Sequence, residues 1–491
     1  MAFLRTHRSL LLVLVFYLVA STLLIDCYPR VWVDEPWESV TAATLVRDGR
    51  LSSPLLEGRS EGWYRIFLEP RILLSLCVAP SFLLFGVGIL QARFVSVLFG
   101  ALLVLGSYLF GARLFSRRAG IITGWLVAIE TMVFIAARTV RPEIYLAALE
   151  VLSLLFYFTA RRDGRTSRFF VAGILTGIAL WTHPNALLHA CAMGLLFVVD
   201  DRSKFLLRKP FWLFAGGAVL AFLPYAVYVA LNDAANGFAA FWAQLAGRPE
   251  EVAKSGWIFA SLRGEWGRFL EYTQFPYRVL IVAVYLWVIV AGFRSKNPIL
   301  RRIILVCGVY FVLSVILLSN KTIVYSAAFL PLLGLIGGKV FDDVLPRRSA
   351  TGTVPSPRGG RFAVLLFVLL SLNEVGGSVY LLYKNRDCSY HRTITELQSA
   401  VPKGARVWGS ITFWFGFSGQ PYRTQYTFFR DVASFQPEYL ILGDREVWSG
   451  KAMWSDVRAR AEALARERGQ LVREISTHCY GDLRVYRIVW R

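Results

Sequence analysis

The sequence lacks the short motifs that mark several large enzyme classes. No C-x-x-C, H-E-x-x-H or G-x-x-x-x-G-K-[ST] pattern occurs in its 491 residues. A dithiol redox centre, a zinc protease and a P-loop ATPase therefore lose support. There is also no block of five or six basic residues, no zinc-finger spacing and no RNA-binding signature. The formal net charge of +21 is thus no sign of a nucleic-acid partner.

The composition is that of a polytopic membrane protein. Hydrophobic residues make up 56% of the chain and aromatic residues 15%, whereas soluble domains are about 45–50% apolar. The basic residues fall in short gaps between long apolar runs, as they do in cytoplasmic loops. We therefore expect an α-helical bundle embedded in the cell (inner) membrane and surrounded by its lipids.

The distribution of charge predicts the topology. The first apolar run, residues 9–25, carries no charge and follows Arg5 and Arg8, which places the N-terminus in the cytoplasm. Alternating eleven spans from there leaves 21 basic but only five acidic residues in the cytoplasmic loops, and it places the C-terminus outside. The predicted spans are residues 9–25, 93–112, 119–137, 144–160, 169–186, 187–199, 211–231, 279–293, 303–319, 322–341 and 362–383.

One further apolar stretch, residues 72–90, is excluded from the spans. If it crossed the membrane, every later basic loop would move outside and the charge bias would reverse. It also contains Pro80, Gly86 and Gly88, which weaken a straight helix. We expect it to lie in the interface or to dip into the membrane without crossing.

Two domains are expected: a membrane domain over residues 1–385 and a small extracytoplasmic α/β or α+β domain over residues 386–491. In the second, Cys388 and Cys479 could form a disulfide if the compartment is oxidising, but spacing alone does not decide this. Its candidate strands and helices are residues 406–409, 439–442 and 483–489, and residues 393–401 and 455–468, respectively.

The loops of the membrane domain differ in composition. The first outer loop, residues 26–92, contains a predicted helix over 37–46 that ends near Gly49. The second, residues 232–278, carries several aromatic and charged residues. Residues 346–361 are rich in Pro, Gly and Ser and predict a flexible cytoplasmic linker.

Asp34 and Glu35 lie just beyond the first span, and we take them as the main functional candidates. With Pro36 they are typical of a helix start, where an acid caps the first turn. Alternatively, a carboxylate at a low-dielectric boundary can take a proton from a hydroxyl nucleophile. Both interpretations fit the sequence.

A second group follows the third span: Arg138, Arg141 and Glu143. The two arginines are one helical turn apart and could both contact one anion, since guanidinium groups match phosphate oxygens. Arg138 could equally be an interfacial residue or part of an internal ion pair. Glu143 is the candidate partner of Asp34, and these carboxylates could bind a divalent cation through their oxygens.

Other candidates for substrate contact are scattered along the chain. Glu69 and Arg71 lie where the first outer loop returns to the membrane, and Lys321 stands alone between two spans, four residues before Tyr325. Lys321 could contact a phosphate or anchor the chain at the interface. His183, beside Pro184, could ligate a metal or move a proton, although a helix-terminus role is favoured. Glu130, inside the third span, has no partner that the sequence reveals.

These residues resemble those of the GT-C superfamily of integral-membrane glycosyltransferases. The resemblance is carried by the Asp-Glu pair after the first span, by the Arg-led segment 92–100 with 111–115, and by Lys321 before an apolar span with Tyr325 and Pro331. Among GT-C proteins, the chain looks similar to the bacterial relatives of protein O-mannosyltransferases and aminoarabinose transferases. The resemblance covers roughly residues 9–340 and, more loosely, the appended outer domain.

The resemblance implies a sugar donor carried on a polyprenyl phosphate, with no nucleotide, and an inverting transfer outside the cytoplasmic membrane. Asp34 would deprotonate a hydroxyl of a lipid, glycan or protein acceptor. The charge of the leaving phosphate would be held by Arg141, Lys321 or a metal. Glu143 stands where relatives often have an aspartate.

The chain departs from the family at one position in the first loop. Many relatives have Lys/His-Pro-Pro-Leu there, whereas this chain has Glu69-Pro70-Arg71-Ile72. Either Arg71 takes over the phosphate contact, or Glu69 joins a metal site. The sequence leaves both alternatives open.

Three rival functions are weighed against a glycosyltransferase. A transporter would be expected to show repeat symmetry and broken helices at the midplane, and no matching halves are seen. An O-antigen-type polymerase or ligase would depend on arginines in late loops rather than on an early acid pair. A structural or assembly subunit would use its outer domain to bind a partner.

Overall fold

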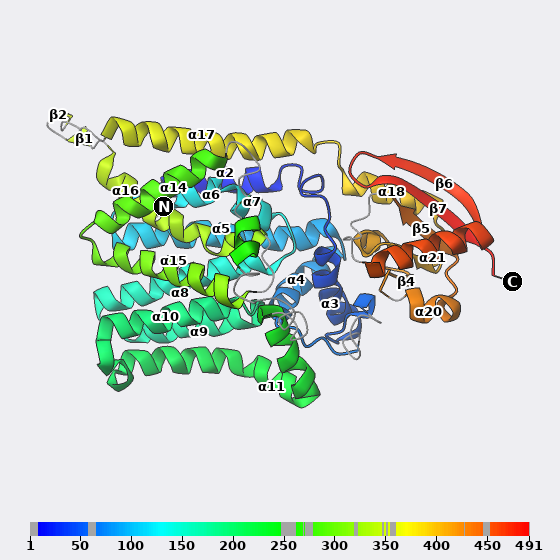
Figure 1. The fold of residues 1–491 in the computed structure, drawn as a ribbon, viewed down its shortest axis with the longest axis horizontal. Helices are drawn as coiled ribbons and strands as arrows, with labels where there is room; N and C mark the ends of the chain where they lie inside the picture. Colours follow the sequence, from blue (N-terminus) through cyan, green and yellow to red (C-terminus); the bar gives the residue numbers. More distant parts are fainter. Residues whose placement is uncertain are drawn as a thin grey trace.

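The computed structural model confirms a mostly helical chain with a small C-terminal sheet (Figure 1). The helices of the membrane domain lie side by side at one end, and the C-terminal domain lies at the other end, beyond helices α3 and α4. The structure describes residues 8–56, 65–246, 262–268, 270, 278–318, 323–345, 348–349, 352–353, 360–426, 428–444 and 452–490.

Each of the eleven predicted spans coincides with a helix or, in one case, with a bent pair of helices. These are α2 Arg8–Thr22, α5 Ile89–Leu114, α6 Arg117–Ile129 with α7 Thr131–Ala137, α8 Pro142–Asp163, α9 Ser167–Thr182, α10 Ala186–Asp201, α11 Lys209–Ala246, α14 Arg278–Arg294, α15 Pro298–Leu317, α16 Leu330–Val344 and α17 Gly360–Lys384. Among the described residues, five helices are long and apolar enough to cross a membrane, or six if the pair α6–α7 is one span. The number of spans, eleven, therefore stays a prediction.

Helix α11 is longer than the sequence predicts. It continues beyond the expected end at residue 231 as far as Ala246, with a break in the helical backbone at Asp233. The predicted second outer loop therefore begins as a helix. Most of the rest of that loop lies outside the described residues.

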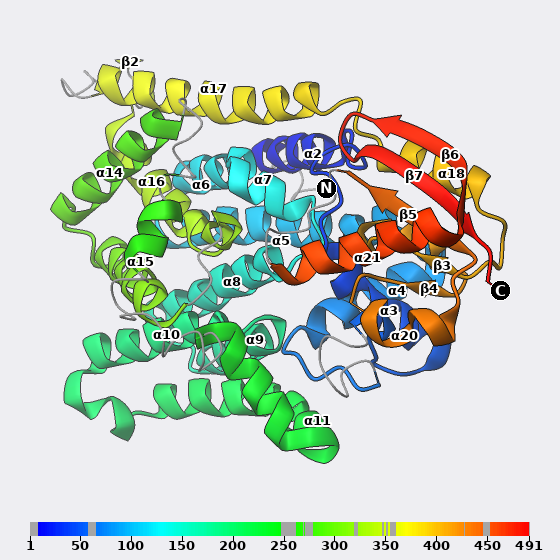
Figure 2. The same cartoon turned by 45° about the vertical axis from the view of Figure 1, so that its right-hand side comes forward.

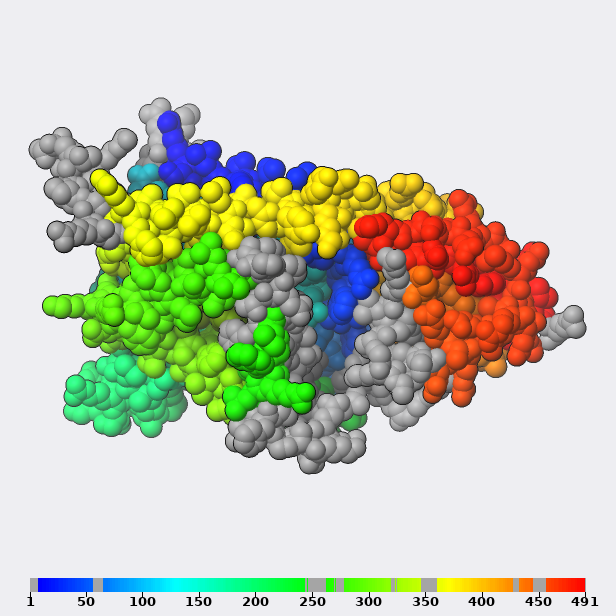
Figure 3. Space-filling view, turned by 45° about the horizontal axis from the view of Figure 1, so that its top comes forward, coloured from blue at the N-terminus to red at the C-terminus, as the bar shows by residue number. Residues whose placement is uncertain are grey.

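Close packing in the bundle depends on small residues at the helix contacts. A Cβ added at Gly173 of α9 would lie 2.0 Å from the carbonyl oxygen of Phe214 in α11, and one at Gly217 of α11 would lie 2.3 Å from that of Phe170. Helices without a hydrophobic driving force between them associate through such close backbone approach. Figure 3 shows α17 lying along the outside of the bundle as far as the C-terminal domain.

The first outer loop folds into two helices and a short turn. Helix α3 spans Asp34–Asp48 and ends at Gly49, whose φ of +66° suits a glycine; the predicted helix is confirmed. Helix α4, Ile72–Phe85, ends at Gly86 and has 14 residues, about 21 Å at 1.5 Å per residue. Helices α2 and α16, which coincide with predicted spans, have 15 residues each. Length therefore does not separate α4 from them, and the expectation that this stretch does not cross stays a prediction. Between them lies the turn η1, Pro54–Leu56.

The C-terminal domain is built on a mixed five-stranded sheet in the order β4-β3-β5-β7-β6. The first three are parallel to one another, and β5, β7 and β6 are antiparallel neighbours. The predicted strands are confirmed as β3, β5 and β7, and the predicted helices as α18 and α21, whereas β4, β6 and α20 were missed. The elements are β3 Val407–Trp408, β4 Tyr422–Arg423, β5 Tyr439–Gly443, β6 Gly469–Thr477, β7 Gly481–Ile488, α18 Tyr390–Ala400, α19 Trp414–Phe417, α20 Phe428–Phe435 and α21 Ala452–Arg468.

Some short elements complete the described chain. Two 3-10 turns, η2 Arg202–Leu207 and η3 Ile323–Ala328, lie in the membrane domain, and a third, η4 Ile411–Phe413, lies in the outer domain. Within the predicted linker, the strands β1 Arg348–Ser349 and β2 Gly352–Thr353 pair antiparallel. The linker is therefore not wholly irregular.

The C-terminal domain packs directly on the first outer loop (Figure 2). The Tyr480 hydroxyl accepts a hydrogen bond from the backbone N–H of Val31 (3.0 Å), and Ser389 donates to Asp26 (2.7 Å). Thr424 also donates to the backbone carbonyl of Leu55 (2.9 Å). Residues far apart in the sequence thus hold both ends of the loop segment that contains α3.

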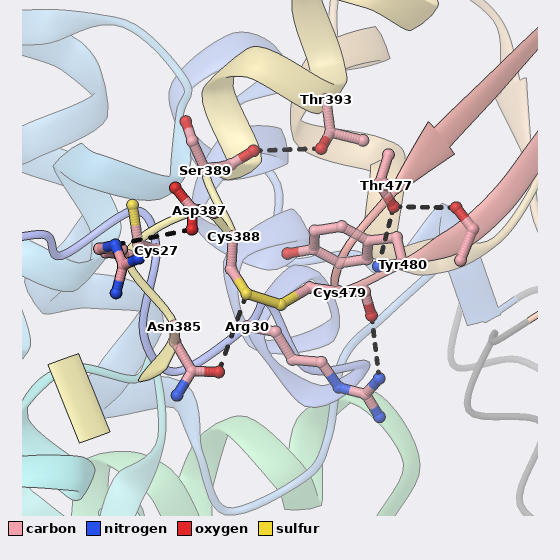
Figure 4. Close-up of a disulfide and its surroundings, with 12 residues drawn as sticks. Cys27, Arg30, Asn385, Asp387, Cys388, Ser389, Thr393, Thr477, Cys479 and Tyr480 are labelled. Carbon is pink, nitrogen blue, oxygen red and sulfur yellow. Dashed lines mark hydrogen bonds and ion pairs between the residues drawn. A yellow bond between two sulfur atoms is a disulfide. The ribbon is translucent and has the colours of Figure 1, made fainter. Parts of the chain in front are cut away.

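Cys388 and Cys479 form a disulfide (Figure 4). Their Cα atoms are 5.4 Å apart, within the usual range. The bond joins the start of α18 to the hairpin of β6 and β7, so the possibility that the sequence left open is realised. The cysteines left free are Cys27, Cys77, Cys191 and Cys307.

The disulfide gives a first testable prediction. Denatured protein prepared without reductant should react with four equivalents of a thiol reagent, and with six after reduction, because the chain has six cysteines. Cys388→Ser with Cys479→Ser should give four in both conditions. The pair closes a loop of 91 residues, so its loss should lower the free energy of unfolding of the domain by about 2–4 kcal/mol. Six reactive thiols in unreduced wild type would contradict the bond.

Candidate functional site

Polar side chains meet at the end of the bundle that faces the C-terminal domain. They come from α3, from the turn before α4, from the turn between α7 and α8, from the end of α9 and from η3. Figure 1 shows α3 and α4 at this junction. Three arrangements of charge can be distinguished there, and each is built around one arginine.

The first arrangement is a buried ion pair between Glu35 and Arg93. Arg93 donates from Nε to Glu35 Oε2 (2.8 Å) and from Nη2 to Oε1 (2.7 Å), and neither side chain is exposed. The backbone N–H groups of Trp32 and Val140 donate to the same carboxylate at 3.0 and 3.1 Å. Four hydrogen bonds satisfy Glu35, which argues against the predicted substrate contact and for a structural role.

Arg138 is also engaged by the protein itself. Its guanidinium donates to the backbone carbonyls of Ala20, Ser21, Leu24 and Tyr28 at 2.7–3.0 Å. These carbonyls include some that a helix leaves unpaired at its C-terminus, here the end of α2. The expectation that Arg138 and Arg141 contact the same anion is therefore not supported by the geometry.

The second arrangement joins Asp34, Arg141 and Glu143. Arg141 forms a short ion pair with Asp34 through Nη1 and donates from Nη2 to Glu143 Oε1 (2.9 Å). The Asp34 side chain is 28% exposed, whereas Arg141 is 12% and Glu143 3% exposed. Asp34 is thus the member of the group that an incoming molecule can reach.

The third arrangement joins Glu38, Glu69 and Arg71. Arg71 Nη1 forms a short hydrogen bond with Glu38 Oε1, and Arg71 Nε lies 3.6 Å from Glu69 Oε2. Burial raises the pKa of Glu38 to about 8; Arg71 opposes the shift, and Glu69 and Asp34 add to it. The pKa of Arg71 is held above its ordinary value by the three acids, against the effect of burial.

His183 and Tyr325 lie between these groups. His183 ends α9, and its Nδ1 accepts a hydrogen bond from the backbone N–H of Asn185 (3.1 Å), so the helix-terminus role is confirmed. Its ring centroid is 5.7 Å from that of Tyr325. Both side chains interact electrostatically with Arg71 and Arg141. Lys321 lies outside the described residues, and its predicted phosphate contact stays a prediction.

The predicted cation site is not preassembled. Arg141 lies between Asp34 and Glu143 and forms ion pairs with both, so the two carboxylates do not face each other directly. In the part of the chain that the structure describes, no three or more His, Cys, Asp or Glu side chains are grouped to hold a metal ion. The expectation of a divalent cation stays untested.

Glu130 has partners that the sequence did not reveal. It stands at the break between α6 and α7, which are bent by 63°, and its Oε2 accepts the backbone N–H of Val133 (2.7 Å). Arg278 of α14 lies 3.7 Å from both Glu130 and Glu374 of α17, and the N–H of Thr131 donates to Glu374 (3.0 Å). This buried group fixes α7, which leads directly into the turn that carries Arg141.

The structure therefore groups Asp34, Glu69, Arg71, Arg141, Glu143, His183 and Tyr325, and it assigns Glu35 and Arg138 to structural contacts. Glu38 was missed. The available signal was its position four residues after Asp34 on the expected helix, which puts both on one face. Arg93 was noted only as part of the resemblance.

The chain is similar to known proteins in sequence over part of its length and in structure over nearly all of it. A family model described as dolichyl-phosphate-mannose-protein mannosyltransferase matches residues 70–228. This stretch contains Arg71, Arg93, Arg141, Glu143 and His183, and it begins after Asp34. The search of curated proteins finds no match.

Solved structures of similar fold cover nearly the whole chain. ArnT from Cupriavidus metallidurans, bound to undecaprenyl phosphate, has a TM-score of 0.66 at 17% identity, covering 100% of this chain and 99% of its own. The oligosaccharyltransferase AglB from Archaeoglobus fulgidus, in complex with an inhibitory peptide and a dolichol-phosphate, has a TM-score of 0.52 at 12% identity, covering 98% and 74%. At this level of identity the likeness establishes the fold.

The buried pair predicts different effects for two adjacent acids. Glu35→Ala leaves Arg93 buried without its counter-charge and should lower the free energy of unfolding by about 3–5 kcal/mol. The Asp34 side chain is partly open to solvent, so Asp34→Asn should change the free energy of unfolding by no more than about 1 kcal/mol. Thermal unfolding of the purified variants in detergent would measure both.

A matched double variant provides the control. Glu35→Leu with Arg93→Met removes both charges together and should recover much of the stability lost in Glu35→Ala. Equal stability of wild type and Glu35→Ala would show that the pair does not hold the loop.

Proposed function

We propose that this chain, which has the fold of the GT-C membrane glycosyltransferases and matches a family model of that superfamily, transfers a sugar from a polyprenyl-phosphate donor to an acceptor hydroxyl on the outer face of the inner membrane. One observation carries the proposal: Asp34 is a partly exposed carboxylate held by the less exposed Arg141, and Arg71 lies within its electrostatic reach. A base and two cations thus face the same region.

In the proposed reaction Asp34 is the general base. Its carboxylate takes the proton of the acceptor hydroxyl while the oxygen attacks the anomeric carbon of the sugar. The bond from that carbon to the phosphate oxygen breaks, and the electron pair leaves with the lipid phosphate. Attack opposite the leaving group inverts the anomeric configuration, and no covalent enzyme intermediate is formed.

Arg141 orients Asp34 in this scheme. Its guanidinium is fixed on its other side by Glu143, and Glu143 is almost fully buried at the first turn of α8. Removing the acid from this position would leave Arg141 free to adopt other rotamers. We therefore assign Glu143 a positioning role, although the sequence presented it as a second catalytic residue.

We assign to Arg71 the stabilisation of the negative charge that develops on the leaving phosphate. The sequence alone assigns the same role to Lys321. Guanidinium groups bind phosphate oxygens strongly, and Arg71 stands two residues after the position at which many relatives have a basic residue. The family model is described by a dolichyl-phosphate-mannose donor, and ArnT and AglB were solved with undecaprenyl phosphate and a dolichol-phosphate. No step is assigned to a divalent cation, because Arg141 occupies the position between the carboxylates predicted to bind it.

The base assignment predicts the effect of Asp34→Asn. Sugar transfer by membranes or purified protein, measured with a panel of labelled polyprenyl-phosphate sugars and native acceptor extract, should fall about 10²–10⁴-fold. Asp387→Asn changes an exposed acid, 73% accessible, and should leave transfer unchanged. Full activity in a folded Asp34→Asn protein would remove Asp34 as the base.

The phosphate assignment predicts a loss of binding rather than of chemistry. Arg71→Gln should weaken the binding of a short-chain polyprenyl phosphate by about 10–100-fold, since a charge-assisted hydrogen bond contributes about 1.5–3 kcal/mol. Arg392→Gln, at a side chain 82% exposed on α18, is the control. Calorimetric titration in detergent would measure both, and unchanged binding in Arg71→Gln would exclude the contact.

A further inference from the structure

Glu38 carries an oxygen atom for which the protein supplies no partner. Its side chain is 1% exposed. Oε1 pairs with Arg71, whereas Oε2 is buried and has no hydrogen bond to any part of the chain that the structure describes. Leaving a buried ionised carboxylate oxygen without a donor is costly. A proton on this oxygen would remove that cost.

Arg71 is shared between two acids on one side of the site. Glu38 contacts Nη1, and Glu69 lies 3.6 Å from Nε. The Nε–H group is itself buried and without a hydrogen-bond acceptor among the described residues. One guanidinium between two carboxylates leaves a net negative charge. A phosphate that approaches Arg71 would therefore meet repulsion as well as attraction.

The groups around Glu38 are few and come from three elements. Asp34 lies one turn earlier on α3, Glu69 and Arg71 stand before α4, and Tyr145 lies on α8. Two of these four neighbours, Asp34 and Glu69, are acids whose negative charge raises the pKa of Glu38. Arg71 alone favours the ionised form of Glu38. If a phosphate drew Arg71 away, that form would lose its only nearby cation.

We propose that Glu38 takes up a proton from the outer solution when the donor phosphate binds, and that this releases the guanidinium of Arg71 for the phosphate. The neutral Glu38 carboxyl keeps its place beside Arg71 without competing for its charge. Up to one proton enters per donor bound, according to the fraction of Glu38 that is still ionised at that pH, and no other bond changes. The inference rests on the proposed function, because it requires a phosphate ligand at Arg71.

The linkage has a definite sign. The protein form that binds is the one in which Glu38 is protonated, so affinity should be nearly constant well below pH 8 and fall as the pH rises through that value, given the pKa of about 8. The apparent dissociation constant should rise about tenfold between pH 7 and pH 9, in proportion to the shrinking protonated fraction.

Proton uptake on binding is the direct test. The probe is the monomethyl ester of a short-chain polyprenyl phosphate, because this diester, like a sugar donor, keeps one negative charge over the whole range. Calorimetry in two buffers of different ionisation enthalpy, with a chelator present, counts the protons. Wild type should take up about one proton per ligand at pH 9 and about a tenth of a proton at pH 7.

Two variants identify the group. Glu38→Gln resembles the protonated side chain and should bind with no proton uptake and no dependence on pH between 7 and 9. Glu69→Gln should still take up a proton above pH 8, because Glu38 is intact. Uptake that persists in Glu38→Gln, or uptake lost only in Glu69→Gln, would overturn the assignment.

The remaining outcomes are also decisive. If Glu38→Gln does not fold, wild type alone still tests the inference, since binding without proton uptake at pH 9 contradicts it. If wild type binds the probe equally well from pH 7 to pH 9, this inference fails and the proposed function stands. If wild type does not bind the probe at all, the proposed function itself fails and the inference with it.

Discussion

The buried pair between Glu35 and Arg93 is the contact on which the geometry of the site depends. It joins the first turn of α3 to the beginning of α5, and the same carboxylate accepts the backbone N–H of Val140 between α7 and α8. Arg141, one residue further, is thereby brought opposite Asp34. Because the four hydrogen bonds to Glu35 satisfy a charge far from water, the relative positions of these segments are fixed before any ligand arrives.

In the rest of the site, each of two arginine side chains pairs with two acidic side chains. Arg141 forms ion pairs with Asp34 and Glu143, and Arg71 forms ion pairs with Glu38 and Glu69. Arg141 is held by one deeply buried acid, Glu143, and also pairs with the more accessible Asp34, whereas both acids beside Arg71 are deeply buried. Such an arrangement keeps the arginines ordered in the absence of ligand. It also leaves more negative than positive charge in the site, which would repel an anionic ligand.

The sequence predicted the helices well because their signal is local. A run of about twenty apolar residues needs no partner to be recognised, and Gly49 and Gly86 mark the ends of α3 and α4 by their backbone preference. The site was predicted in outline for the same reason, since charges in apolar surroundings stand out. The sequence could not show which groups pair with one another. Arg138 could have contacted an anion or the end of α2, and only the folded structure distinguishes the two.

Glu130 shows a second limit of local patterns. Neither Pro nor Gly stands at the break between α6 and α7, so nothing in residues 119–137 marks a bend of 63°. The bend depends on Glu374 and Arg278, which are 244 and 148 residues away. Similarly, β6 was missed because its outer residues are exposed and alternate poorly, although its pairing with β7 is extensive.

The hydrogen bond from Val31 to Tyr480 spans 449 residues, and this has a consequence for biogenesis. The segment that presents Asp34 is synthesised well before the tyrosine that contacts it. Until residues 386–491 have been synthesised, the first outer loop has no C-terminal domain to pack against. The contacts that hold the segment around α3 can therefore form only after the C-terminal sheet has been made.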